Sequence, residues 1–363
     1  MSLNGASEQS EQEPAVWPPS AVRQSSSGKP SRPVWMGCLL GLAGGFTVLV
    51  LLAGALFVIF AALIVVSSVG GTARTGLPLT EVTVSGERGA PKVALVPVRG
   101  LLLRGGFGED PLRLLEAMLD RAGKDEQVHA VILSVDSGGG GMTTCDMMHR
   151  RLLDYREETG TPVVALVEGI GASGAYYVSC AADHIIAHPT SLTGSIGVLM
   201  QLYDAGGLME KVGVQDRTVK SGRFKDMGSP FAQKSREDWE RDQEVLSDII
   251  RQMHERFIQV VARERGLPRE EVRPIADGRI FTGQEALQLK LVDQIGYRDD
   301  AVAKVRDMTG LDRVHVVEYA RVPTLREMLI GRVGDREVTV RLGEELPLQR
   351  SPRPMYLWAP GAP

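Results

Sequence analysis

A continuous apolar segment lies near the start of the chain. From Met36 to Val69 there is no Asp, Glu, Lys or Arg, and its core, residues 47–66, is almost entirely aliphatic or aromatic. About 20 helical residues, each rising about 1.5 Å, cross a bilayer core of about 30 Å. The segment is longer than the apolar part of a signal peptide (about 7–15 residues), and no persuasive small-residue cleavage site follows it. The pattern therefore predicts one transmembrane helix within residues 36–69.

Charges beside this segment predict its orientation. The nearest charged residues before it are Arg23, Lys29 and Arg32, whereas the residues after it carry both signs. Because basic residues favour the cytoplasmic side, we expect a single-pass protein with its N-terminus in the cytoplasm. The rest of the chain would then lie on the periplasmic or extracellular side of an inner or plasma membrane.

After residue 90, short apolar runs alternate with amphipathic segments. The apolar runs that predict buried strands are residues 92–98, 128–135, 162–167 and 184–187. One helix is predicted to begin at Asp110, an N-cap followed by Pro111, and a long amphipathic helix to span Arg236–Arg265. Strands separated by helices of about 10–15 residues predict a parallel sheet with crossover helices, which is an α/β fold.

These patterns divide the chain into five parts. Residues 1–35 hold eight Ser and five Pro, which predicts a disordered cytoplasmic tail. Residues 36–69 are the predicted anchor, and residues 70–90 fit a linker or an edge strand. One α/β domain is expected at residues 91–343. The remaining residues, 344–363, form a C-terminal tail that is too short and proline-rich for a second span, and we hypothesise that it docks on a neighbouring subunit.

Composition and charge mainly exclude certain classes of protein. The 363 residues are 43% hydrophobic and 24% charged, as in a globular protein with a core. A net charge of −4, from 41 basic and 45 acidic residues, argues against general binding of nucleic acid. Three cysteines (Cys38, Cys145 and Cys180) exclude a disulfide scaffold, and we expect ordinary thiols. No His or Cys spacing is typical of a metal site, so neither metal nor cofactor is expected.

Two glycine-rich segments are candidates for chemistry. Residues 136–141 connect a predicted strand to a predicted helix, where a turn exposes amide groups to an anion or oxyanion, or simply bends the chain. In residues 169–177, Ser173 stands between small residues at a second strand-to-helix transition. This setting suits an exposed nucleophile, and it equally suits a serine packed closely between helices.

A nucleophilic serine needs a proton acceptor, and the sequence offers several candidates for it. His184 and His188 flank a predicted strand and could approach the edge of the sheet. A third segment, residues 219–230, offers Lys220 and Lys225. Neutral lysine serves as a base where burial lowers its pKa from about 10.4, whereas most lysines are solvated surface cations. Sequence patterns alone do not choose among these residues.

Together these segments resemble the signal peptide peptidase A family of membrane-tethered Ser–Lys serine peptidases. The resemblance extends over about residues 92–310, with the motifs in the family's order, and their joint occurrence is more specific than any single motif. The similar segments are Val135–Gly141, Gly171–Tyr177, Leu192–Val198, Lys220–Phe231 and Gly278–Ala286, followed by Leu289, Leu291–Asp293 and Gly296.

The resemblance implies a role for each matching residue. Ser173 would be the nucleophile and Lys225 the general base, and Ser195 would orient the lysine amine by a hydrogen bond. The amides implied to bind the oxyanion are those of Gly139, Gly140 and Gly174. Two residues depart from the family pattern: Gly138 stands where Pro is usual and Ala175 where Gly is frequent. Neither departure removes a reacting group.

The resemblance also implies a fold, a reaction and partners. The fold would be a Clp-protease/crotonase-like spiral of βα units, preceded by one transmembrane helix, in a homo-oligomer with active sites between subunits. The reaction would be hydrolysis of cleaved signal peptides and other hydrophobic or membrane-associated polypeptides. The lipid bilayer, contacted through residues 36–69, would be the other partner, with no role for nucleic acid.

Three other interpretations stay open. The first is a catalytically weak or inactive membrane scaffold of the same family that forms a ring. The second is an acyl-CoA enzyme of the same fold, against which the external location argues. The third is a Ser–His protease that uses His184 or His188 instead of Lys225.

Overall fold

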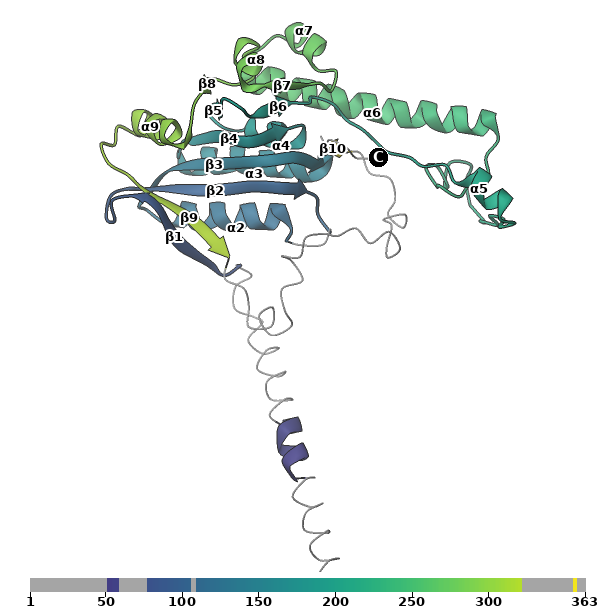
Figure 1. Cartoon of the computed structure of the whole chain (residues 1–363), viewed down its shortest axis with the longest axis horizontal. Coiled ribbons are helices and arrows are strands. Elements are labelled where there is room, and N and C mark those ends of the chain that lie inside the picture. Colours follow the sequence, from purple (N-terminus) through teal and green to yellow (C-terminus); the bar gives the residue numbers. More distant parts are fainter. Residues whose placement is uncertain (1–50, 59–76, 106–108, 322–354, 358–363) are drawn as a thin grey trace, which may run out of the picture. The chain divides into compact units, whose positions relative to one another are not determined.

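The computed structural model describes residues 51–58, 77–105, 109–321 and 355–357 (Figure 1). The chain forms two compact units, residues 1–75 and residues 76–363. In the first unit residues 51–58 are helical, and all eight are exposed. The rest of the predicted span lies outside the described residues. Within the described part of the chain, no helix is both long enough and apolar enough to cross a membrane.

The second unit is built on a mixed sheet of ten strands. Its main order is β1-β9-β2-β3-β4-β5-β8, while β10 pairs with β3, and β6 pairs with both β4 and β7. Neighbours from β9 to β8 are parallel, as predicted, and β1 is an antiparallel edge strand. The strands are β1 (Leu79–Gly86), β2 (Lys92–Leu102), β3 (Val128–Gly141), β4 (Val163–Ala172), β5 (His184–Ala187), β6 (Leu192–Gly194), β7 (Ile280–Thr282), β8 (Gln294–Ile295), β9 (His315–Arg321) and β10 (Met355–Leu357).

Helices cover both faces of this sheet. The helices of this unit are α2 (Pro111–Lys124), α3 (Met142–Thr159), α4 (Gly174–Ser179), α5 (Gly206–Lys211), α6 (Arg236–Arg265), α7 (Arg269–Val272), α8 (Gly283–Gln288) and α9 (Arg298–Thr309), with the 3-10 helix η2 (Arg273–Ile275); all except α5 belong to the layers around the sheet. Successive residues of a strand point to opposite faces. Accordingly Ala94 and Val96 pack with α2, α3, α4 and α6, while Val93 and Leu95 pack with α9.

Most predicted elements are confirmed. The Asp110 side chain accepts hydrogen bonds from the amides of Leu112 and Arg113, which caps α2. The predicted strand at 184–187 and the predicted helix at Arg236–Arg265 have the expected bounds. For residues 70–90 the sequence suggested a linker or an edge strand. Residues 79–86 form an edge strand. Cys145 and Cys180 are free, buried thiols, as expected.

One local prediction is wrong. Residues 136–141 were expected to form a turn, but they continue β3 as far as Gly141, and α3 begins at the next residue. The reason is that β2 continues beside them, with Leu101 opposite Gly139 and Leu102 opposite Gly140. A strand neighbour supplies hydrogen bonds that the sequence pattern does not reveal.

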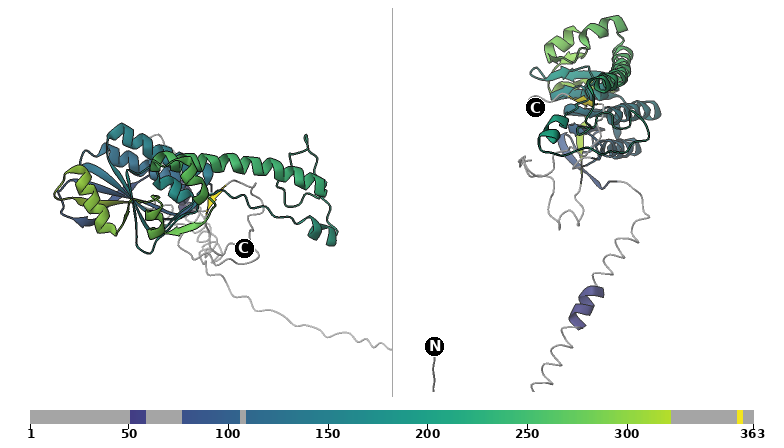
Figure 2. Two further views of the ribbon diagram at one scale, coloured as in Figure 1. Left: turned by 90° about the horizontal axis from the view of Figure 1, so that it is seen from above. Right: turned by 90° about the vertical axis from the view of Figure 1, so that its right-hand side faces the viewer.

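The two halves of α6 have different surroundings. In its C-terminal half, Phe257, Val260 and Val261 are fully buried against the sheet layer, whereas its N-terminal half buries only Asp242 and Leu246. Figures 1 and 2 show α6 running past the sheet, with α5 beside its far end. We call residues 203–242 the arm, and the sheet with the helices packed on it the body.

Candidate active site

The carboxyl ends of three parallel strands bring the predicted site residues of the body together. In the β4–β6 pair, Ala172 lies opposite Gly194, so Ser173 and Ser195 each follow a paired residue. The amide of Ser173 donates to the carbonyl of Gly194 at 2.7 Å. The end of β3 lies on the other side of β4, with Ser137 opposite Gly171. Parallel α/β sheets place their functional residues at this edge.

Ser173 and Ser195 share an unusual backbone conformation. Their φ angles are 54° and 50°, and Lys290 is the one other non-glycine residue with positive φ in the described ranges. Such a conformation costs about 1–2 kcal/mol for a residue with a Cβ, and it concentrates at functional sites. Both serines are also buried, with exposed fractions of 1% and 6%. The fold therefore holds these two hydroxyls in strained, sheltered positions.

Ser173 is the N-cap residue of α4, but its side chain does not cap the helix. The preference of serine for N-caps normally comes from that hydrogen bond. At this position the hydroxyl is therefore available to another partner. Gly174 is the first residue of α4, where helix amides have no intrahelical acceptor. Ala175, one of the two departures from the family pattern, is fully buried in the core.

The other two predicted oxyanion residues lie in β3. Gly139 has a φ of 98°, which favours glycine, and a Cβ on Gly140 would approach the carbonyl oxygen of Leu102 to 2.2 Å. The Gly139 amide donates to the Ser137 hydroxyl at 3.0 Å, and that hydroxyl donates to a main-chain carbonyl of β2. In this single chain, therefore, the Gly139 amide is already engaged.

A cavity of about 720 Å³ adjoins Ser195. It lies between residues 195–202 and α6, and aliphatic side chains form much of its wall. The apolar residues around it are Val198, Leu199, Met200, Leu202, Leu246, Ile250 and Ala276. A space of this size and chemistry suits hydrophobic side chains of a bound peptide.

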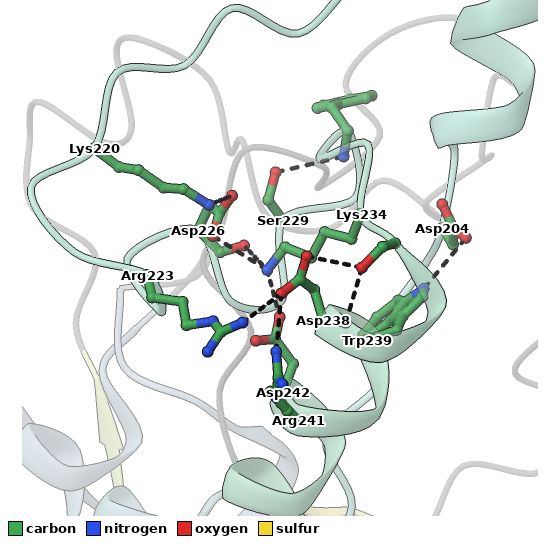
Figure 3. Close-up of polar contacts among 12 residues, drawn as sticks. Asp204, Lys220, Arg223, Asp226, Ser229, Lys234, Asp238, Trp239, Arg241 and Asp242 are labelled. Carbon is green, nitrogen blue, oxygen red and sulfur yellow. Dashed lines mark hydrogen bonds and ion pairs between the residues drawn. The ribbon is translucent and has the colours of Figure 1, made fainter.

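Lys225 lies in the arm and directly precedes Asp226. Asp226 belongs to a cluster of charged residues (Figure 3). Asp226 accepts from Lys220 at 2.6 Å and forms an ion pair with Lys234 at 3.1 Å. Lys234 also donates to the main-chain carbonyl of Asp226 and to the buried carboxylate of Asp242. We call Lys220, Asp226, Lys234 and Asp242 the arm cluster. Because Asp226 directly follows Lys225, the arm cluster fixes the main chain beside the predicted base.

Opposing effects set the charges of the arm cluster. Burial alone would raise the pKa of Asp226, but hydrogen bonds from Lys220 and Lys234 bring it below its ordinary value. Burial would lower the pKa of Lys234, and its bonds to Asp242 and Asp226 raise it instead. Sequence reasoning missed Lys234 and Asp242, since neither residue type nor their spacing marks them.

The arm cluster distinguishes between the two lysines that the sequence offers as candidates for the base. Lys220 is held by the carboxylate of Asp226, and an ammonium group in an ion pair is a poor proton acceptor. Lys225 is exposed, and no hydrogen bond or ion pair engages its side chain within the described ranges. Of the two, Lys225 is therefore the better candidate for a base.

Within one chain, Lys225 does not meet the serines. Tyr177, on the helix that Ser173 begins, packs against Phe257 with ring centroids 5.1 Å apart. The segment around Lys225 is attached to the other end of α6, where Arg223 pairs with Asp238 at 3.1 Å. Positions 238 and 257 are nineteen steps apart along the helix, which corresponds to roughly 30 Å. The structure thus brings Ser173 and Ser195 together but leaves Lys225 apart from both.

The alternative histidine bases have other partners. His184 approaches Gln294 at 3.4 Å, and His188 bonds to Thr190 at 3.0 Å while its ring packs on Tyr297. None of their hydrogen bonds in the described structure reaches Ser173. In the same residues, no group of three or more His, Cys, Asp or Glu side chains is arranged to hold a metal ion.

Comparison with known proteins identifies the family. Residues 156–312 match the model of peptidase family S49. A protein named as a signal peptide peptidase from Enterococcus faecium is 33% identical over 252 residues, covering 66% of this chain and 71% of that protein. The chain belongs to peptidase family S49. This membership confirms the resemblance seen in the sequence and the class of enzyme expected from it, a serine peptidase.

Other relatives agree with this assignment. A protease of Synechocystis is 35% identical over 221 residues, covering 61% of this chain and 76% of that protein. A protein named as a protease from Methanocaldococcus jannaschii is 38% identical over 202 residues, which span 56% of this chain and 63% of the relative. Among solved structures, a membrane-bound stomatin-specific protease with a substrate peptide aligns at a TM-score of 0.41 and 15% identity, covering 67% of this chain and 97% of that chain. A TM-score of this size supports no inference about function.

Proposed function

We propose that this S49 peptidase is a membrane-tethered endopeptidase with a Ser–Lys dyad, Ser173 as nucleophile and Lys225 as general base. The observation that carries the proposal is the position of Ser173, buried and strained at a strand-to-helix junction beside Ser195. A neutral lysine amine needs no carboxylate to fix a tautomer, unlike histidine. It does need a dry environment and a hydrogen-bond acceptor, which Ser195 can supply.

The proposed reaction has two steps. In the first, the Ser173 oxygen attacks the scissile carbonyl carbon while the Lys225 amine takes the hydroxyl proton. Main-chain amides of Gly139 or Gly140 and of Gly174 stabilise the negative oxygen, and Lys225 then returns the proton to the leaving amine. In the second, water attacks the acyl-enzyme with Lys225 again accepting a proton, which releases the acid product and Ser173.

The dyad would form between two chains. Lys225 and Ser173 are separated along α6 in one chain, so a second copy must supply the lysine. The arm displays large apolar side chains that a second chain could cover: Tyr203, Leu208, Val212, Val214, Val219, Phe224 and Phe231. Covering this surface would also remove Lys225 from water and give it the dry environment that a lysine base needs. We therefore propose a homo-oligomer with active sites between subunits.

The substrates would be cleaved signal peptides and other hydrophobic or membrane-associated polypeptides. The apolar cavity beside Ser195 supports this preference. For the membrane anchor, the supporting features are the uncharged sequence of residues 36–69 and the exposed Leu51, Leu52 and Phe57 of its helical part. The peptidase domain would lie on the external side. Its parallel βα units support the Clp-protease/crotonase-like spiral that we propose for the fold.

The nucleophile can be tested in the full chain in detergent. Ser173→Ala is expected to lose hydrolysis of a hydrophobic fluorogenic peptide and labelling by a fluorophosphonate. The matched control is Ser179→Ala, a buried serine of the same helix whose hydroxyl bonds to the Ala175 carbonyl, and it should keep both. Equal hydrolysis by Ser173→Ala and wild type would reject the assignment. Intact binding of peptide without labelling of the wild type would favour the scaffold interpretation.

A further inference from the structure

A shift of register divides β4 into two parts. As far as Val167, β4 follows β3 in one register, and the next pair joins Gly171 to Ser137, so that β4 has advanced two residues more than β3. β4 also changes its other neighbour here, because it pairs with β5 up to Val167 and with β6 from Ile170. We call residues 168–170 the β4 bulge. Extra residues of this kind bend a strand and re-aim the side chains that follow.

The β4 bulge decides which part of β3 lies beside Ser173. If the register before the bulge continued, Ser173 would lie level with Gly141, the last residue of β3. In the register after the bulge, Ser173 follows Gly171 by two residues and lies level with Gly139. Gly139 is the predicted oxyanion residue with positive φ. The bulge therefore sets the predicted nucleophile against the predicted oxyanion segment.

A carboxylate of β3 holds the bulge. Asp136 Oδ1 accepts a hydrogen bond from the main-chain amide of Ile170 at 3.0 Å. In the described sheet Ile170 lies opposite no residue of β3, so the side chain supplies a bond that the strand pairing omits. Gly169 lies against the same oxygen, and a Cβ at that position would approach Asp136 Oδ1 to 2.6 Å. The carboxylate reaches the amide because residue 169 has no side chain.

A second carboxylate anchors the start of the bulge. Glu168 accepts from the Ser134 hydroxyl at 2.6 Å and from Arg298 at 2.5 Å. Burial would raise the pKa of Glu168, but these two bonds bring it below its ordinary value. If the Asp136 bond is lost, Glu168 therefore still holds the first residue of the bulge. The part that loosens is the end nearer Ser173.

We propose that Asp136 is a positioning residue that keeps Ser173 level with the oxyanion segment. This inference rests on the proposed function, because it takes Ser173 as the nucleophile. Misplacing a reacting group by about 1 Å can cost about 10²-fold in rate, so Asp136→Ala should lower kcat by about 10–10²-fold. KM for a hydrophobic fluorogenic peptide should stay unchanged in the full chain. Asp136→Asn keeps the acceptor oxygen, and its kcat should stay close to that of wild type.

The same strand offers a matched control. The Asp183 carboxylate accepts from the amide of Val163, the first residue of β4, at 2.9 Å, and it also pairs with Arg156. Asp183→Ala should therefore cost at least as much stability in urea unfolding as Asp136→Ala, yet leave kcat unchanged. Equal kcat in Asp136→Ala and wild type, equal losses in the two alanine variants, or no rescue by Asp136→Asn would overturn the proposal.

Hydrogen exchange separates this inference from the peptidase assignment. The Ser173 amide is protected by its bond to the Gly194 carbonyl. In full-length Asp136→Ala, exchange should accelerate at residues 170–173 and stay unchanged at residues 163–167, with the reverse pattern in Asp183→Ala. Gly169→Ala, which displaces the carboxylate, should act like Asp136→Ala and add nothing to it. This pattern upholds the positioning role even if Ser173 proves not to be the nucleophile, and unchanged exchange at residues 170–173 contradicts it.

Discussion

The body and the arm would contribute two different halves of the proposed active site. In the body, Ser173 and Ser195 follow paired strands, both are buried, and both hold a strained φ that the sheet enforces. In the arm, Lys225 is exposed, and the arm cluster, rather than a hydrophobic core, fixes its main chain. In the proposed dyad, the serine half is therefore complete within one chain. The lysine half would become a base only when another surface covers it.

The substitution with the largest expected effect tests which lysine of the arm is the general base. Lys225→Ala should lower kcat/KM by about 10²–10⁴-fold, the usual contribution of a general base. Lys220→Ala removes a partly exposed ion pair worth at most about 1 kcal/mol, so kcat/KM should fall by less than about fivefold. Equal losses in the two variants would remove the distinction between these lysines.

The arm cluster provides the next test. Lys234→Met leaves the buried carboxylate of Asp242 unpaired, which we expect to cost about 3 kcal/mol. Hydrogen exchange should accelerate at amides of residues 203–242 and stay unchanged in β2, β3 and β4. Adding Asp242→Leu removes the unpaired charge and should restore much of the protection. If the body exchanges faster as well, the arm is not an independent half-site.

A smaller effect is expected in the body. Ser195→Ala deletes a hydrogen bond to the lysine amine, worth about 1.5–3 kcal/mol if the amine is charged and less if it is neutral. We therefore expect kcat to fall by up to about 10²-fold while fluorophosphonate labelling of Ser173 persists more slowly. The control is Ser191→Ala, another buried serine, whose hydroxyl bonds to the His188 carbonyl. A Ser195→Ala enzyme as active as that control would show that the serine does not orient the lysine.

The smallest predicted effect concerns the pH dependence of the body's stability. Burial, with nearby Arg263, lowers the pKa of His149 to about 4 from its ordinary value near 6.5. Because the unfolded chain takes up the proton first, stability is full above pH 6.5 and falls as pH drops toward 4. Linkage gives a loss of about 2 kcal/mol at pH 5. In urea unfolding, His149→Phe should lose less stability than wild type as the pH falls. An unchanged dependence of the free energy of unfolding on pH would exclude His149 as its source.

Sequence patterns predicted the body better than the arm. Apolar runs, the Asp110 cap and the small residues around Ser173 are local signals, and each matches an element of the structure. The continuation of β3 through Gly141 was missed because it depends on β2, which lies far away in the sequence. The same limit applies to the arm, where the amphipathic pattern of α6 predicts a buried face but not that its first half leaves the sheet. The pairing of Lys234 with Asp242 likewise carries no sequence signal.

We propose that one chain supplies Ser173 and another supplies Lys225. Full-length Ser173→Ala and Lys225→Ala should each be inactive alone. After they are mixed under conditions that allow subunits to exchange, about a quarter of the sites should combine both intact residues, and activity should return toward that fraction of wild type. The control is Lys225→Ala mixed with a variant that carries both Ser173→Ala and Lys225→Ala. This mixture has no intact Lys225 and therefore no intact site. Activity restored only in the first mixture is the result that we predict; no activity in either, despite demonstrated exchange, would contradict a dyad shared between chains.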